Sequence, residues 1–251
     1  MRTSEDAITR ALCLAAVVTR ANAEYLVGLD EPVPLFVELT GVEPKDAPLR
    51  IDQWLSRERL TAGLSLNERA LLNMAAGGWP KQDLLNAFWR REALMAILWS
   101  LRIVDPMPPS DVQLELGDLL RSVGLLKETS QFRKVASLRS AEEVRKMRDH
   151  AEFWLWRART TQLQNSPDSS NDPRISKEKL EVIIAQAAEA GEQKGLFRCI
   201  EGDFPAFGKP FRRLSEDEWS LMNSICRERL YGLNWLCNVD GVQWDHVRTG
   251  T

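Results

Sequence analysis

The sequence predicts an all-α protein: one mostly helical domain over residues 1–251, with at most one short β-hairpin near residues 196–207. Two observations support this prediction. Apolar residues recur at intervals of three and four along most of the chain, which is the spacing that buries one face of a helix. Several of these stretches open with Ser or Thr followed three residues later by an acid, the pattern of an N-terminal capping box.

The composition is that of an ordinary globular protein. Hydrophobic residues make up 44% of the chain and charged residues 27%, and a chain of this length can bury roughly 75% of the surface of its unfolded form. The net charge of −3 creates no global attraction to nucleic acid or to an anionic membrane. No apolar stretch approaches the roughly 18 residues of a membrane span. We therefore expect a soluble protein without a membrane partner.

Cysteine usage and the N-terminal residues both favour a cytoplasmic location. The four cysteines show no CxxC spacing, and Cys13 and Cys226 lie on apolar helix faces, as reduced and buried thiols do. The apolar run at 11–18 imitates the core of a secretory signal peptide. However, Glu5 and Asp6 fall where such a peptide would be basic. We therefore expect a cytoplasmic protein.

Apolar spacing, capping pairs and helix-breaking residues place the helices in order. The predicted helices span residues 4–28, 49–60, 65–76, 80–104, 110–124, 140–163, 176–191 and 215–237. The helix at 80–104 is apolar nearly all round from Ala93 to Leu101, which predicts a central place in a bundle. It must end before Pro106, because proline cannot continue the helical hydrogen bonds.

Two segments are predicted to be non-helical. Residues 164–175 form a polar, proline-containing run, which is typical of a flexible loop or linker. The extended stretches 196–200 and 203–207 flank Glu201-Gly202, so this dipeptide is the expected turn of the one short hairpin.

The C-terminal helix carries the clearest pattern. Ser215 and Glu218 form a capping box at its start. The stripe that it should bury consists of Trp219, Met222, Cys226, Leu230, Leu233 and Leu236. Residues 238–241 then end the helix, and Trp244 is expected to pack the following tail onto the bundle. The tryptophans to which we assign a structural role are Trp89, Trp99, Trp219, Trp235 and Trp244.

Several blocks of the sequence resemble one protein family. LSEDEW at 214–219, RERLYGLNWLC at 227–237 and QWDHVRTGT at 243–251 resemble the C-terminal signature of a widespread bacterial family, domain of unknown function 4272. The blocks at 2–21 and 89–101 resemble further parts of that family, and DFPAFGKPFRRLSEDEW is similar to a subgroup of it. The family has no established activity, so the resemblance implies a fold and no particular chemistry.

Glu92 is the first candidate for a functional residue. It is expected to face the core, where an ionised carboxylate needs a cationic partner such as Arg157 or Arg229. We prefer the interpretation that this is a structural ion pair. The alternative is an enzyme, of hydrolase type or metal-assisted, in which Glu92 is a general base in a bundle-core pocket. Asp245 and His246 of the tail would then complete the site.

The sequence offers little for a metal or a cofactor. Asp245 and His246 could supply an oxygen and a nitrogen, but the chain has only two histidines, and HExxH, paired CxxC and EF-hand patterns are absent. Walker and dinucleotide spacings of glycine are also absent. We therefore predict no metal and no cofactor.

Basic residues give the more interesting hypothesis. Residues 121–148 contain eight Lys or Arg against three acids, and FGKPFRR at 207–213 adds a stiff cationic loop. The residues proposed to bind are Arg133, Lys134, Arg139, Lys209, Arg212 and Arg213. The expected partner is another protein, with nucleic acid as an alternative that no known motif supports. Our leading prediction is thus a non-catalytic, macromolecule-binding domain.

Overall fold

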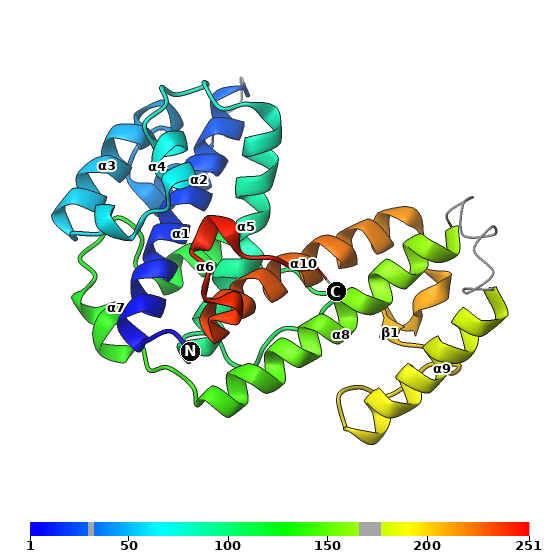
Figure 1. Ribbon diagram of the computed structural model, residues 1–251. Coiled ribbons are helices and arrows are strands. Elements are labelled where there is room, and N and C mark those ends of the chain that lie inside the picture. The colour runs from blue at the N-terminus through cyan, green and yellow to red at the C-terminus, as the bar shows by residue number, and fades with distance from the viewer. Residues whose placement is uncertain (30–32, 166–176, 251) are drawn as a thin grey trace.

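The computed structural model describes residues 1–29, 33–165 and 177–250, and it consists mainly of α-helices (Figure 1). The α-helices are α1 Ser4–Val27, α2 Pro34–Thr40, α3 Ala47–Arg57, α4 Leu66–Leu72, α5 Lys81–Ser100, α6 Leu116–Ser122, α7 Ser130–Val135, α8 Ala141–Asn165, α9 Lys177–Gln193 and α10 Glu216–Cys237. Short 3-10 helices span Pro44–Asp46, Thr61–Gly63, Phe211–Arg213, Val239–Gly241 and Trp244–His246. Strands β1 Pro205–Ala206 and β2 Lys209–Pro210 form an antiparallel pair. The all-α prediction is confirmed.

Four long helices organise the core. Helix α10 packs against both α5 and α8, and α1 packs against α5. From Glu92 to Ser100 every residue of α5 is buried, which confirms its predicted central position. Gly232 allows α10 to approach α5 closely, since a Cβ at this position would lie 2.9 Å from the carbonyl oxygen of Ala93. No helix in the described part of the chain is long and apolar enough to cross a membrane.

The predicted caps and buried thiols are present. Thr3 with Asp6, Ser65 with Glu68 and Ser215 with Glu218 form capping boxes that start α1, α4 and α10. Ser140 and Glu143 exchange the same hydrogen bonds at the start of α8. The free thiols of Cys13 and Cys226 are buried, and burial raises their pKa values to about 11 and about 12.

Three helices end three or four residues earlier than predicted: α3 ends at Arg57 and not at residue 60, and α4 and α5 also end early. In α4 and α5, the backbone groups beyond the helix end have other hydrogen-bond partners. Helix α5 ends at Ser100 and not at residue 104: Arg102 has φ +59°, and the amides of Ile103 and Val104 donate to the carbonyl of Leu98. Helix α4 ends at Leu72 and not at residue 76. The Arg20 guanidinium donates to the carbonyls of residues 74 and 75, which lie just beyond it.

The region between α5 and α7 also differs from the prediction. Only Leu116–Ser122 of the predicted helix 110–124 is helical. The segment before it is irregular because the Arg229 guanidinium holds the carbonyls of Pro108, Pro109 and Val112. Helices α2 and α7 were not predicted, since seven and six residues are too few to show a helical repeat.

The hairpin lies further along the chain than predicted. Pro205 pairs with Pro210 and Ala206 with Lys209, and the turn between them is Phe207-Gly208, both with positive φ. The predicted turn at Glu201-Gly202 closes only a single bridge, between Ile200 and Asp203. In the predicted loop 164–175, residues 164 and 165 belong to α8, and the others lie outside the described residues.

Candidate functional site

Glu92 and Arg229 form a buried ion pair between α5 and α10. Arg229 Nε donates to Glu92 Oε2 at 3.0 Å, and the two side chains are 4% and 1% exposed. Nη1 donates to the carbonyls of Pro108 and Pro109, and Nη2 to that of Val112, at 2.8, 2.9 and 2.6 Å. Each guanidinium nitrogen therefore has a partner within the protein. The pair ties the loop after α5 to the helical core.

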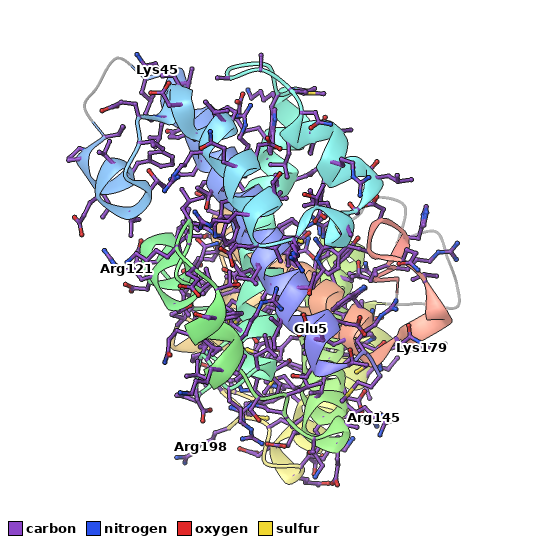
Figure 2. All side chains as sticks on the ribbon, turned by 90° about the vertical axis from the view of Figure 1, so that its left-hand side faces the viewer. Glu5, Lys45, Arg121, Arg145, Lys179 and Arg198 are labelled. Atoms are coloured by element: carbon purple, nitrogen blue, oxygen red, sulfur yellow. The ribbon has the colours of Figure 1, made fainter. Side chains whose placement is uncertain are left out.

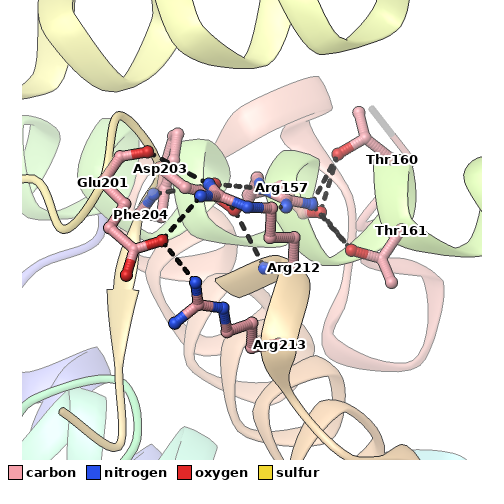
Figure 3. Close-up of polar contacts among 8 residues, drawn as sticks. All are labelled: Arg157, Thr160, Thr161, Glu201, Asp203, Phe204, Arg212 and Arg213. Carbon is pink, nitrogen blue, oxygen red and sulfur yellow. Dashed lines mark hydrogen bonds and ion pairs between the residues drawn. The ribbon is translucent and has the colours of Figure 1, made fainter. Parts of the chain in front are cut away.

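Arg157, the other proposed partner of Glu92, instead pairs with Asp203 (Figure 3). Arg157 lies on α8 and is fully buried. Its Nε and Nη2 donate to the two carboxylate oxygens of Asp203 at 2.8 and 2.9 Å, the bidentate geometry that arginine favours. Nη1 donates to the hydroxyl of Thr161 at 2.7 Å. This pair fastens the segment before the hairpin to α8.

The Asp203 carboxylate also accepts hydrogen bonds from two backbone amides. Besides Arg157, Oδ1 accepts the amide of Phe204 at 2.8 Å and Oδ2 that of Arg212 at 2.9 Å (Figure 3). Burial by itself raises the pKa of Asp203, whereas the hydrogen bonds and charge of Arg157 lower it. Together with the two amides they bring the pKa below its ordinary value. Asp203 was missed in the sequence because its partner lies 46 residues away.

The C-terminal tail packs on the opposite end of α10 from this network. Trp244 is buried, its ring lies 4.8 Å from that of Tyr231, and the Tyr231 hydroxyl donates to the Trp244 carbonyl. Asp245 Oδ2 accepts the amide of Asn67 at 3.1 Å. The tail is therefore attached to α10 and to the start of α4, and Trp244 packs it onto the bundle as predicted.

Asp245 and His246 line a cavity of about 420 Å³ together with Arg10 and Trp235. Glu92 does not line this cavity, so the predicted bundle-core pocket that combined Glu92 with the tail is not assembled. The Asp245 carboxylate accepts a hydrogen bond from the backbone amide of Asn67, and Arg10 pairs with Glu68 at 2.6 Å. Within the described residues, no group of three or more His, Cys, Asp or Glu side chains is placed to hold a metal ion.

The tryptophans to which a structural role was assigned differ in burial. Trp99, Trp235 and Trp244 are buried, whereas Trp89 and Trp219 are half-buried. Trp219 donates its indole N–H to the carbonyl of Ala158 at 2.8 Å, which joins α10 to α8. These rings contribute to packing and to contacts between helices.

Most of the proposed binding cations are engaged within the protein. Arg139 is buried and donates to the carbonyl of Trp99. Lys209 pairs with Glu218 at 2.7 Å. Arg212 and Arg213 both pair with Glu201, at 2.9 and 2.8 Å (Figure 3). The cationic loop at 207–213 is therefore paired with the neighbouring acids Glu201 and Glu218. The structure does not bring this loop together with residues 133 and 134.

The segment 126–135 instead joins the end of α3. Trp54 donates its indole N–H to the carbonyl of Lys127 at 2.7 Å, and the Arg57 guanidinium donates to the same carbonyl at 3.3 Å. Glu58 Oε2 accepts the amide and the hydroxyl of Thr129, at 3.1 and 2.7 Å. Arg133 Nε donates to that hydroxyl at 3.1 Å. These contacts place two basic segments beside each other.

We call the result the α3–α7 surface, and its cations are Arg57, Arg59, Lys127, Arg133 and Lys134. Figure 2 shows the molecule with this side toward the viewer, and Glu5 and Arg121 are labelled there. Arg57 pairs with Glu58, and Arg133 pairs with Glu5. The other three cations are exposed and have no ion-pair partner among the described residues. The sequence shows the Arg-Glu-Arg run at 57–59, but nothing in it indicates that this run meets α7.

Fold and contacts together define a helical protein in which buried ion pairs hold a loop and a hairpin onto a core of four long helices. A family model described as Domain of unknown function (DUF4272) matches residues 1–179, and the chain belongs to this family. No curated protein and no solved structure matches the chain significantly. The matched range includes Glu92 and the α3–α7 surface, whereas Asp203, Arg229 and the C-terminal blocks at 214–251 lie beyond it.

Proposed function

We propose that this protein is a non-catalytic binding domain that recognises an acidic protein through the α3–α7 surface. One observation carries the proposal: three exposed cations, Arg59, Lys127 and Lys134, have no ion-pair partner in the part of the chain that the structure describes, and they lie on segments joined by direct hydrogen bonds. The segments are held in place by the buried Trp54. Because the backbone that carries these cations is already fixed, a partner has to order only their side chains when it binds.

The contacts of Glu92 and of its two candidate partners, Arg157 and Arg229, support a non-catalytic role. The hydrogen-bonding positions of Arg157 and Arg229 are occupied within the protein, and Glu92 is 1% exposed. A general base must reach the proton that it removes. Glu92 lies at the centre of the bundle, and its carboxylate forms an ion pair with Arg229. This arrangement favours the structural interpretation of Glu92.

The size and charge of the surface favour a protein over a nucleic acid. Duplex DNA is bound through basic stripes that neutralise many phosphates. Here the cations are few, Glu5 and Glu58 lie among them, and the whole chain has a net charge of −3. A small cationic patch of this kind steers association with a complementary acidic patch, and its effect decreases as salt is added.

The test is a comparison of three forms of the full chain as bait: wild type, Arg133→Glu/Lys134→Glu, and the charge-matched control Lys81→Glu/Lys194→Glu, which changes exposed lysines elsewhere. Arg133 and Glu5 form a partly exposed pair, with side chains 30% and 69% exposed, worth about 0–1 kcal/mol, so the reversed variant should fold. We expect it to lose a protein that wild type and control both retain, with capture by the wild type weakening as salt increases.

Two results would contradict the proposal. If the reversed variant retained every partner of the wild type, the α3–α7 surface would not be a binding site. If the material lost were nucleic acid and not protein, the class of partner would be wrong. Circular dichroism and thermal unfolding of all three baits ensure that any loss of capture is not a loss of folding.

A further inference from the structure

A largely apolar cleft of about 480 Å³ lies between α8, the loop at residues 107–111 and the β1–β2 hairpin. Met107, Met147, Trp154 and Phe197 contribute to its walls. Sites for small molecules typically have volumes of roughly 300–1,000 Å³ and combine an apolar lining with a few polar groups. The cleft has these dimensions and this lining, and it is separate from the α3–α7 surface.

The walls of the cleft are held by the two buried ion pairs. Arg229 binds the carbonyls of Pro108 and Pro109 and so fixes the loop on one side. The Arg157–Asp203 pair fixes the segment leading into the hairpin on the other side. The two walls are also joined directly, because Asp111 Oδ2 accepts the amide of Phe207 at 2.7 Å. A cleft with fixed walls is preorganised, so a ligand does not have to order it.

One polar group that lines the cleft is the imidazole of His150. Its Nε2 accepts the indole N–H of Trp154 at 2.8 Å. A ring nitrogen that accepts a hydrogen bond carries no proton, so the neutral ring carries its proton on Nδ1. Burial, and then the charge of Arg229, lower the pKa of His150 and keep the ring neutral. Nδ1–H has no protein acceptor among the described residues. It is therefore free to donate to a ligand, and it is uncharged because the ring is neutral.

We propose that this cleft binds a neutral, apolar or aromatic small molecule that presents one acceptor, such as a ketone oxygen, to the Nδ1–H group of His150. Three features select this chemistry. The apolar walls disfavour a charged ligand, which would lose its hydration. The Nδ1–H group of the neutral His150 ring favours an acceptor oxygen. The carboxylate of Asp111, which also lines the cleft, opposes an anion.

The probe for this site is 6-propionyl-2-(dimethylamino)naphthalene, a neutral dye with one ketone whose emission shifts to the blue in apolar surroundings. We expect saturable binding at one site of the full chain. Met147→Trp should abolish binding, because the indole fills the cleft. Met74→Trp, at a more exposed methionine after α4, is the matched control and should bind the dye as wild type does.

His150→Phe tests the hydrogen bond itself. The variant keeps an aromatic ring but removes the Nδ1–H donor, so affinity for the ketone dye should fall roughly threefold to tenfold. Affinity for 2-(dimethylamino)naphthalene, which lacks the ketone, should not change. This second dye corrects for any altered packing in the variant, because it uses the same walls without the acceptor.

NMR of the wild-type chain labelled with ¹⁵N-histidine gives an independent readout, since the chain has only two histidines and His246→Asn assigns them. We expect the Nδ1–H tautomer for His150 and a change of its nitrogen shifts when the ketone dye is added. An Nε2–H tautomer, unchanged shifts, or dye binding by Met147→Trp at wild-type affinity would overturn the proposal. The titration needs no variant at residue 150, so it remains decisive if His150→Phe fails to fold.

Discussion

Arginine has contrasting environments in two regions of this molecule. On the α3–α7 surface, Arg57 and Arg133 are 48% and 30% exposed, and each pairs with a single carboxylate. Between α8, α10 and the hairpin, Arg157 and Arg229 are 0% and 4% exposed, and each of their nitrogens has a partner. An exposed pair contributes little stability and can exchange one partner for another, whereas a buried pair cannot lose a member without leaving an uncompensated charge. The first environment suits recognition and the second suits folding.

The largest expected effect is that of removing the Asp203 carboxylate. Asp203→Ala should lower the free energy of unfolding by about 3–5 kcal/mol, because Arg157 would remain buried without its counter-charge. The amides of Phe204 and Arg212 would lose their acceptor as well. Urea unfolding followed by circular dichroism measures the loss. Asp203→Asn keeps the shape and should cost less, and a loss below about 1 kcal/mol for Asp203→Ala would show that the buried pair is not needed for folding.

Glu92→Gln should have an intermediate effect. We expect a loss of about 1–3 kcal/mol, because Arg229 keeps its three backbone carbonyls and loses only the carboxylate charge. Thermal unfolding is the measurement. An unchanged or raised melting temperature would contradict the structural role of Glu92 and would revive the alternative of a catalytic carboxylate.

The smallest effect concerns pH. The pKa of Asp203 is lowered from its ordinary value of 3.8 in the folded state, so the folded form binds this proton less readily than the unfolded form. The stability that Asp203 contributes is therefore present above pH 3.8 and is lost as the pH falls through the lowered pKa. The stability difference between wild type and Asp203→Asn should narrow below pH 3.8. Urea titrations at several acidic pH values test this, and a constant difference would mean that Asp203 is not the group responsible.

Local patterns in the sequence predicted most of the helices and their starts. The capping boxes at Thr3, Ser65 and Ser215 and the buried face of α5 depend on residues three or four apart, so they can be recognised without the fold. Helix ends were less accurate. The end of α4 and the start of α6 depend on Arg20 and Arg229, which take backbone carbonyls from distant parts of the chain.

The sequence by itself thus determined the all-helical class, the order of the long helices, the burial of Glu92 and the attachment of the tail by Trp244. Only the tertiary structure decided which polar and charged groups meet. Glu92 pairs with Arg229 across 137 residues, and Glu58 meets Thr129 across 71, and both contacts depend on how the helices pack. The physical reason is that periodicity and capping act within one turn of helix, whereas an ion pair or a cleft needs segments that become neighbours only in the folded chain.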